Sequence, residues 1–267
     1  MQCKEIIEII EENYPKEAAL TFDNVGLQAG RSTKKVSKIL LALDATTPVI
    51  ELAEKQDVDM LITHHPLIFS PLKSITDQDF VGRRILRLIQ DDIAYYAMHT
   101  NYDVLGMAEL SEEILQLKET EVLDVTGEFF GISQGIGRVG LLESTMSLRS
   151  FCDYVKEKLV LSNIKVFGDL DKKIKKVAIS PGSGKSEIAV ALKHNVDVLV
   201  TGDIGHHEGL DAMEQGLAII DAGHYGTEYI FVDDMKKYLS QRCPGVEIIT
   251  EPISHPFQVV YVRAGER

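Results

Sequence analysis

The chain has 267 residues, of which 45% are hydrophobic and 26% are charged, and its formal net charge is -13 at pH 7. This composition predicts a globular protein whose core is large enough for one large or two medium domains. The negative charge argues against general electrostatic binding to nucleic acid or to an anionic membrane surface, because both need basic patches.

The N-terminal segment, residues 1–15, is predicted to form a helix near residues 2–12. Acidic residues interrupt the apolar ones throughout this segment, so it has the pattern of neither a signal peptide nor a membrane anchor. We therefore expect a cytoplasmic protein. Cys3, Cys152 and Cys243 are far apart and form no C-x-x-C pair. This spacing predicts ordinary thiols and argues against a disulfide framework or a thiolate zinc site.

An internal repeat organises the sequence. Residues 39–63 align without gaps to residues 177–201, and each copy has the pattern of a strand, a turn, a helix and a second strand. The strands are nearly continuous apolar runs, which is typical of parallel strands that helices cover on both faces. The sequence therefore predicts an α/β fold from an internal duplication, built mainly of three-layer α/β/α domains.

The two copies differ where their helices are expected to begin. In the first copy Thr47 is predicted to cap a helix that has Pro48 at its first position. The second copy has "SPGSGKS", residues 180–186, which resembles the phosphate loop G-x-x-x-x-G-K-[ST]. The first glycine of that loop is replaced by Ile179, within a run typical of a buried strand. We predict a glycine-rich turn with Ser183 as a candidate helix cap, and no phosphate loop.

The remaining elements complete two sheets and their covering helices. Further helices are predicted near residues 78–90, 107–117, 147–159, 206–215 and 227–240. Further strands are predicted near residues 93–99, 136–142, 217–222 and 246–250. A turn-rich stretch near residues 125–137 is the best candidate for the crossing between domains. We therefore predict a first domain of residues 1–125 with 229–267, and a second domain of residues 126–228.

Most of the eight histidines fall at or just beyond predicted strand ends. Ligands of open α/β sheets collect outside the carboxyl ends of parallel strands, so these positions are candidates for a binding site. The polar residues at these ends are His64 and His65, then His99, Asn101 and Asp103, then Asp203, His206 and His207, and finally His224 and Glu228.

A subset of these residues has the composition of a metal centre. His224 and Glu228 are four residues apart at a predicted helix start, so both side chains can project from one face about 6 Å apart along the axis. His64 and His65 are consecutive and can share a metal only if the chain leaves the sheet there. Together with Asp103 they supply three imidazoles and two carboxylates, enough for two divalent ions about 3.5 to 4 Å apart. Imidazole and carboxylate suit Zn, Mn, Fe, Co or Ni.

Each of these residues also has a simpler interpretation. A single histidine at a strand end is usually a capping or hydrogen-bonding group. Asp103 could cap a helix, and Glu228 could favour the first turn of one. The coincidence of all four segments at the ligand-binding end favours the joint site. His194 and His255 have no such support and are predicted to be structural.

Over nearly its whole length the chain resembles the GTP cyclohydrolase 1 type 2 homologues, also called the Nif-three-like family. The motifs that carry the resemblance are, in order, "TFDNVGLQAG", "ITHHPLIF", "HTNYD", "GIGRVG", "VAISPGSG", "VTGDIGHHEGLDA" and "DAGHYGTE". The resemblance implies two similar, intertwined α/β domains. It is to the short form of the family, because the chain has no room for the extra domain that many relatives carry between the halves.

The resemblance also implies a dinuclear metal site. Carried over by motif, the ligands would be His64, His65, Asp103, His224 and Glu228. The pair His206 and His207 belongs to the family pattern but lies outside this ligand set, and we expect either a supporting or substrate-contacting role or a structural one. Three positions depart from the pattern without removing a ligand, namely Phe22, Tyr102 and Pro181.

The family name implies hydrolytic opening of the guanine ring of GTP with release of formate. We expect a dinuclear metal-dependent hydrolase in which Glu228 and Asp103 are catalytic, with His99, Asn101, Asp203, His206 and His207 as candidates for supporting or substrate-binding residues. The alternative is a metal-binding scaffold or chaperone-like protein without catalysis. The resemblance further implies assembly into a hexameric ring, and a nucleotide or other small molecule as substrate.

Overall fold

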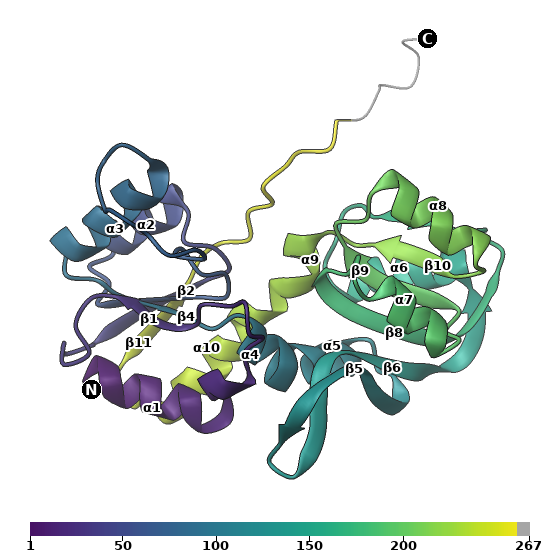
Figure 1. Ribbon diagram of the computed structural model, residues 1–267, viewed down its shortest axis with the longest axis horizontal. Coiled ribbons are helices and arrows are strands. Elements are labelled where there is room, and N and C mark those ends of the chain that lie inside the picture. The colour runs from purple at the N-terminus through teal and green to yellow at the C-terminus, as the bar shows by residue number, and fades with distance from the viewer. Residues whose placement is uncertain (261–267) are drawn as a thin grey trace.

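A computed structural model describes residues 1–260 of the chain, so the last seven residues of the predicted first domain lie outside the described residues. The chain forms two lobes, each built on its own mixed sheet (Figure 1). Helices cover both faces of each sheet, so the predicted α/β class with three-layer lobes is confirmed. Among residues 1–260, no helix is long and apolar enough to cross a membrane.

The first lobe contains a sheet with the strand order β1-β4-β3-β2-β11. Its strands are β1 (Gly26–Ala29), β2 (Lys38–Ala42), β3 (Met60–Thr63), β4 (Ala94–Ala97) and β11 (Glu247–Thr250). All neighbours are parallel except β1, which pairs with β4 in the antiparallel sense. One face packs on α1 (Cys3–Asn13) and α10 (Ile230–Arg242), and the other on α2 (Thr47–Lys55) and α3 (Phe80–Gln90). The C-terminal part of the chain therefore returns to complete the first lobe.

The second lobe contains a sheet with the strand order β5-β6-β8-β9-β10-β7. Its strands are β5 (Lys118–Phe129), β6 (Ile132–Ser147), β7 (Lys165–Phe167), β8 (Lys173–Ser183), β9 (Val198–Gly202) and β10 (Ala218–Asp221). Helix α6 (Leu148–Lys158) packs on one face. The helices α7 (Ile188–Lys193) and α8 (His206–Glu214) pack on the other. The parallel core β8-β9-β10 repeats the arrangement β2-β3-β4 of the first lobe.

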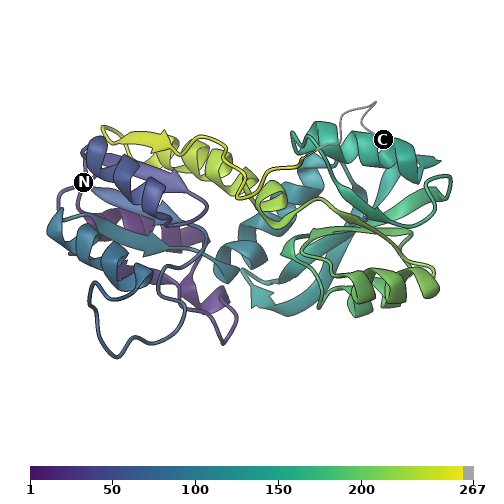
Figure 2. The same cartoon turned by 90° about the horizontal axis from the view of Figure 1, so that it is seen from above.

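Helices carry the first two crossings between the lobes, and after β11 the chain runs back toward the second lobe, where His255 and Phe257 border a cavity with Leu161 (Figure 2). The first crossing follows β4 as one helical segment: α4 (Thr100–Tyr102), a π-helical turn (Asp103–Met107) and α5 (Ala108–Ile114). The second is the short helix α9 (His224–Glu228), which leads into α10. The predicted helix 107–117 therefore begins earlier than expected. The predicted helix 227–240 is two helices, which meet at Tyr229.

Two predicted helix caps are wrong by a few residues. Thr46 caps α2, because its side-chain oxygen accepts a hydrogen bond from the backbone N–H of Val49, and Thr47 is the first helical residue. Ser183 is the last residue of β8, where it pairs with Gly202 of β9. The strand therefore continues through the glycine-rich run, and α7 begins only after a further turn.

The sequence also misses β1, β5 and β7. The strand β5 is mostly exposed and carries few apolar residues, so it lacks the continuous apolar run of the parallel strands. It pairs with β6 along its length in a long hairpin. The predicted domain boundary between residues 125 and 126 therefore falls inside β5, and the second sheet already begins at Lys118.

Candidate metal centre

The cluster lies where strand ends of both lobes meet. His64 and His65 follow β3, and two hydroxyl groups fix the turn there. Thr63 Oγ1 donates to the carbonyl of His65 at 2.7 Å, and the Tyr95 hydroxyl also contacts this carbonyl at 3.0 Å. The backbone N–H of His64 donates to the carbonyl of Ala42, the last residue of β2, and that of His65 donates to the carbonyl of Leu43. Groups of the first lobe thus hold the backbone of the two consecutive histidines in place.

The structure brings all five predicted ligands together. His64 Nε2 lies 3.4 Å from Asp103 Oδ1 and 3.7 Å from Glu228 Oε1. His65 Nε2 and His224 Nε2 each lie 3.0 Å from Glu228 Oε2. These contacts define two groups that share Glu228, one with His64 and Asp103 and the other with His65 and His224, and within each group the ligand atoms lie within 4.8 Å of one another. Asp103 stands on the π-helical turn, an irregularity that is frequent at functional sites.

The hydrogen bonds of two imidazoles determine what their inward nitrogens can do. His65 Nδ1 lies 2.9 Å from Asp44 Oδ1, and His224 Nδ1 lies 2.7 Å from Asp203 Oδ2. A carboxylate can only accept, so each Nδ1 carries the proton and each neutral ring presents a lone pair on Nε2. The two Nε2 atoms are 3.1 Å apart, and both face Glu228 Oε2. Three acceptors at this distance repel one another unless a cation or a proton lies between them.

His64 has the same arrangement with a backbone partner. Its Nδ1 lies 3.0 Å from the carbonyl oxygen of Met98, and its Nε2 is buried. Within residues 1–260, His64 Nε2 is buried without a hydrogen-bonding partner, and the buried Glu228 Oε2 faces the Nε2 atoms of His65 and His224. Buried polar atoms without partners are costly, and a bound cation removes that cost. The donor set therefore fits divalent metal ions, with each imidazole oriented by a hydrogen bond to its other nitrogen.

The electrostatics of the cluster depend on the same contacts. Burial raises the pKa of Asp103; the neighbouring His64 opposes this shift and Glu228 adds to it. Burial also opposes ionisation of Glu228, but the surrounding imidazoles outweigh it and hold its pKa well below its usual range. Burial lowers the pKa of His65 and His224, but their carboxylate partners outweigh it and raise the pKa values to about 10 and about 9. Cations that bind here would have to replace these protons.

The glycine-rich run of the second copy packs against the cluster. Gly182 has a φ of +73°, and a Cβ atom at this position would lie 2.1 Å from Glu228 Oε1. Its backbone N–H donates to Thr227 Oγ1 at 2.9 Å. Lys185, the lysine of the incomplete phosphate motif, is exposed and forms an ion pair with Glu208. The backbone of the run thus lies close to Glu228 at Gly182, and the side chain of Lys185 pairs with a carboxylate on α8.

The predicted supporting residues have different surroundings. His99 belongs to a third group of potential ligands with His64 and His65, and its Nδ1 lies 2.9 Å from Asp23 Oδ1. Asp23 also accepts from the backbone and hydroxyl of Thr100; burial opposes its ionisation, but these bonds lower its pKa to about 2. Asp203 orients His224, as described above.

Three other positions lie apart from the ligand atoms. Asn101 is fully buried, and its amide donates to the carbonyl of Tyr14 at 2.8 Å, so it joins α4 to the N-terminal segment. His206 and His207 begin α8, are exposed, and contact each other with ring centroids 5.2 Å apart. Neither belongs to a potential metal-binding group among the described residues. A supporting or substrate-contacting role for this pair stays a prediction.

The sequence interpretation missed Asp44 and Asp23, the carboxylates that orient His65 and His99. A signal for Asp44 was present, because it follows the first strand of the repeat just as the candidate ligands follow later strands. Asp23 lies in an irregular segment before β1, and nothing in its local pattern indicates that it reaches α4. The carbonyl of Met98 carries no signal in the sequence at all.

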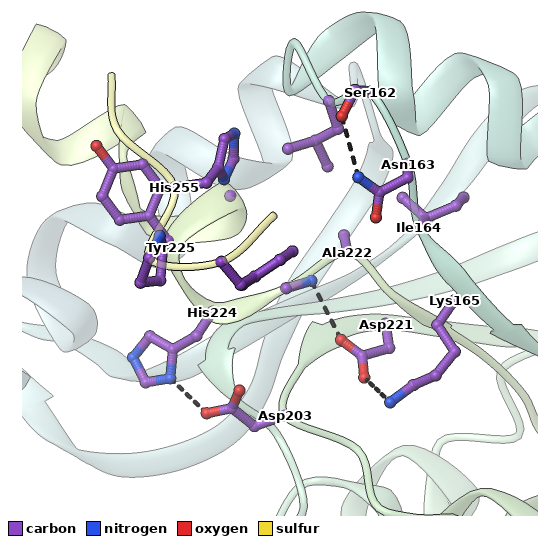
Figure 3. A pocket seen from close by; sticks show the side chains of 15 residues that line it. Ser162, Asn163, Ile164, Lys165, Asp203, Asp221, Ala222, His224, Tyr225 and His255 are labelled. Atoms are coloured by element: carbon purple, nitrogen blue, oxygen red, sulfur yellow. Dashed lines mark hydrogen bonds and ion pairs between the residues drawn. The ribbon is translucent and has the colours of Figure 1, made fainter. Parts of the chain in front are cut away.

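Two cavities border His224. One, of about 270 Å³, also reaches His99, Asp103 and Glu228, and residues of the β8–α7 turn line it as well. The other, of about 390 Å³, lies on the side of Asp203 and is shown in Figure 3. In that view the His224 ring points toward Asp203, and Lys165 and Asp221, which also line this cavity, form an ion pair at 2.7 Å. A small molecule in the first cavity would contact the candidate ligands directly.

The family model described as "Duf34/NIF3 (NGG1p interacting factor 3)" matches residues 1–256 of the chain. A Clostridium perfringens protein named "GTP cyclohydrolase 1 type 2 homolog" is 36% identical over 264 residues, which are 97% of this chain and 100% of that protein. The crystal structure of a Bacillus cereus protein related to NIF3 has a TM-score of 0.91 at 28% identity, covering 97% of this chain and 99% of that one. "Reduced HcgD from Methanocaldococcus jannaschii" has a TM-score of 0.81 at 34% identity, covering 94% and 97%. The similarity spans both lobes.

Proposed function

The chain belongs to the Duf34/NIF3 family, and from this premise we propose that it is a hydrolase that uses two divalent metal ions held between its lobes. The observation that carries the proposal is the convergence of His65 Nε2, His224 Nε2 and Glu228 Oε2, three acceptors within 3.1 Å of one another. The ions would be Zn, Mn, Fe, Co or Ni, because the donors are imidazoles and carboxylates.

Each residue of the cluster has a defined part in this proposal. One ion would be held by His64 and Asp103, the other by His65 and His224, and Glu228 would offer one carboxylate oxygen to each. When bound, such ions polarise a substrate oxygen and lower the pKa of water. The cluster is assembled only when both lobes are in place, since its two groups join residues 64 to 103 with residues 224 to 228.

The chain's own side chains would position the substrate. Asp103, Glu228 and His224 line the cavity of about 270 Å³, so a molecule in it lies against both carboxylates. Asp44 and Asp203 hold the imidazoles in one tautomer and orientation. Glu228 is only 4% exposed, which keeps its charge in a region of low dielectric where its interactions are strong.

The specific reaction that we propose is hydrolytic opening of the guanine ring of GTP with release of formate. Its support is the name shared by relatives such as the Clostridium perfringens and Methanocaldococcus jannaschii proteins, which are 36% and 34% identical to this chain. Assembly into a hexameric ring is part of the same proposal, and sedimentation of the purified protein would test it. The competing function is a metal-binding scaffold without catalysis.

Glu228→Gln tests the proposal. The substitution keeps the volume of the side chain but removes the charge that both ions share, so we expect loss of about one ion per chain and at least a ~100-fold lower rate of formate release from GTP. Elemental analysis and a formate assay measure the two effects, and circular dichroism should be unchanged.

Glu214→Gln, which removes an exposed carboxylate at the end of α8, is the matched control and should behave as wild type. A wild-type protein that binds metal but hydrolyses neither GTP nor other nucleotides and phosphoesters would favour the scaffold. Equal turnover by wild type and Glu228→Gln would assign the activity to a contaminant. Less than half an ion per chain after metal supplementation would contradict the dinuclear centre.

A further inference from the structure

A buried carboxylate that belongs to none of the metal-binding groups lines the cavity beside the metal centre. Glu187 lies on the turn before α7 and is 6% exposed. It borders the same cavity of about 270 Å³ as His99, Asp103, His224 and Glu228. The turn that follows the glycine-rich run of the second copy therefore places a buried acidic side chain in the wall of the same cavity as the candidate ligands.

The hydrogen bonds of Glu187 leave half of its carboxylate unused. Ser186 Oγ donates to its Oε1 at 2.9 Å, whereas its Oε2 is buried and has no hydrogen-bonding partner in the described part of the chain. Burial raises the pKa of Glu187, and the bond from Ser186 only partly opposes this. Leaving a buried acceptor unpaired destabilises the folded state, so folding alone does not explain this position.

Asp221, another buried carboxylate outside the metal centre, is paired more fully. Asp221 pairs with Lys165 at 2.7 Å and also accepts two backbone N–H groups. Within residues 1–260, the carboxylate of Glu187 accepts a hydrogen bond from the hydroxyl of its sequence neighbour Ser186 alone. This contrast indicates that its second oxygen serves a ligand.

The walls of the cavity indicate the shape of that ligand. The lining includes the apolar residues Phe22, Ile136 and Pro181 together with serine side chains and Glu187. The volume lies near the lower end of the range for small-molecule pockets, which begins at roughly 300 Å³. A single flat heterocycle fits such a space, with one polar edge turned to Glu187 and the reacting part turned to the metal centre.

We propose that Glu187 recognises the substrate by accepting hydrogen bonds from two adjacent N–H donors, the edge that guanine and other cyclic guanidines present. An ionised carboxylate only accepts, and paired N–H donors match it in a bidentate arrangement. Adenine presents an acceptor at the corresponding ring nitrogen and is disfavoured. The inference rests on the proposed function in that the same cavity holds the substrate, but it is a claim about binding and can be tested without turnover.

Calorimetry on the metal-loaded full-length protein tests this assignment. Wild type should bind guanosine at least ~10-fold more tightly than 1-methylguanosine or adenosine, because each of these lacks a donor that Glu187 accepts. Glu187→Gln should weaken guanosine binding by about the same factor while leaving adenosine binding within ~3-fold. Metal content should not change. Glu208→Gln, which removes a carboxylate on α8 that does not line the cavity, is the matched control.

The outcomes separate this inference from the proposed function. Equal binding of the three nucleosides by wild type would overturn it, whatever the fate of the variant. So would a Glu187→Gln variant that keeps the preference for guanosine or that loses affinity for all three nucleosides alike. If the preference for guanosine depends on Glu187 but no formate is released, the recognition stands and the proposed hydrolysis fails. If formate is released and Glu187→Gln alters neither the rate nor the preference for guanosine, the proposed hydrolysis stands and recognition by Glu187 fails.

Discussion

The first lobe contributes its candidate ligands after β3 and β4, whereas the second contributes them only after β10. The corresponding end of β9 carries Gly202 and Asp203 where β3 is followed by His64 and His65. Gly202 allows close approach, since a Cβ atom there would lie 2.5 Å from the backbone nitrogen of His224. The same strand end therefore carries candidate ligands in the first copy and packing and orienting residues in the second.

A second comparison concerns the segments after β4 and β10. Both have a histidine followed four residues later by a carboxylate, His99 with Asp103 and His224 with Glu228. In each lobe an aspartate binds the histidine Nδ1, Asp23 in the first and Asp203 in the second. Asp103 and Glu228 each belong to at least one of the two metal-binding groups that share Glu228. Of the two histidines, His224 belongs to one of these groups, whereas His99 belongs to neither. Duplicated strand ends therefore keep their pattern while their chemistry diverges.

The largest expected effect comes from Gly182→Ala, which disturbs the second lobe where it supports the shared carboxylate. The new Cβ atom would lie 2.1 Å from Glu228 Oε1, so Glu228 must move. We expect loss of bound metal and a fall in activity of about 100-fold, since misplacement by about 1 Å can cost this much. Gly216→Ala is the matched control, because Gly216 also has a positive φ, +84°, but its Cβ would meet nothing within 4 Å. Equal metal loss in both variants would mean that backbone strain, not the contact with Glu228, is responsible.

Substitution of the aspartates that orient the histidines tests whether the two lobes contribute equally to metal affinity. Asp44→Asn and Asp203→Asn each weaken the bond that fixes a ring in the group formed by His65, His224 and Glu228. We expect each to lower metal affinity by roughly 10- to 100-fold, as is usual for partners of metal-binding histidines. Asp23→Asn acts on His99, which is outside that ligand set, and should change metal affinity by less than either. A competitive chelator titration measures all three, and an equal loss with Asp23→Asn would make His99 a ligand.

The pH dependence of the metal-free protein probes the junction between lobes. The pKa values of His65 and His224 are raised to about 10 and about 9, above the unfolded value of about 6.5. The folded state therefore holds more protons between these values, so its extra stability is complete below pH 6.5 and is lost as pH rises through 9 and 10. The unfolding temperature of chelator-treated protein should fall over this range. The double variant His65→Gln/His224→Gln should show a flatter profile; an identical slope would contradict the assignment.

The smallest expected effect is that of Lys185→Ala. This side chain is exposed and pairs with Glu208, in the run that lacks the first glycine of a phosphate loop. We expect unchanged metal content and less than a ~10-fold change in any nucleotide hydrolysis, because exposed ion pairs contribute little. Complete loss of phosphate release from ATP or GTP would show that the run binds phosphate after all.

The sequence by itself determined the α/β class, the repeat and the five side chains that converge on one centre. These features have local signals: apolar runs identify buried strands, and polar residues that follow them fall at one edge of each sheet. The repeat placed the start of the second copy's helix too early, because β8 continues to Ser183 and α7 begins only at Ile188. The sequence did not predict the long hairpin of β5 and β6, because the exposed strand β5 lacks a continuous apolar run.

Only the tertiary structure decided how these groups act on one another. Asp44 reaches His65 across 21 residues of chain, and Asp23 reaches His99 across 76. Gly182 matters because Glu228, 46 positions later, fills the space that its side chain would need. Glu187 looks in sequence like an ordinary residue at a helix start, and only the folded cavity leaves one of its oxygens without a partner. Burial, tautomer and close approach depend on which atoms meet through space, and a local pattern of residues does not contain that information.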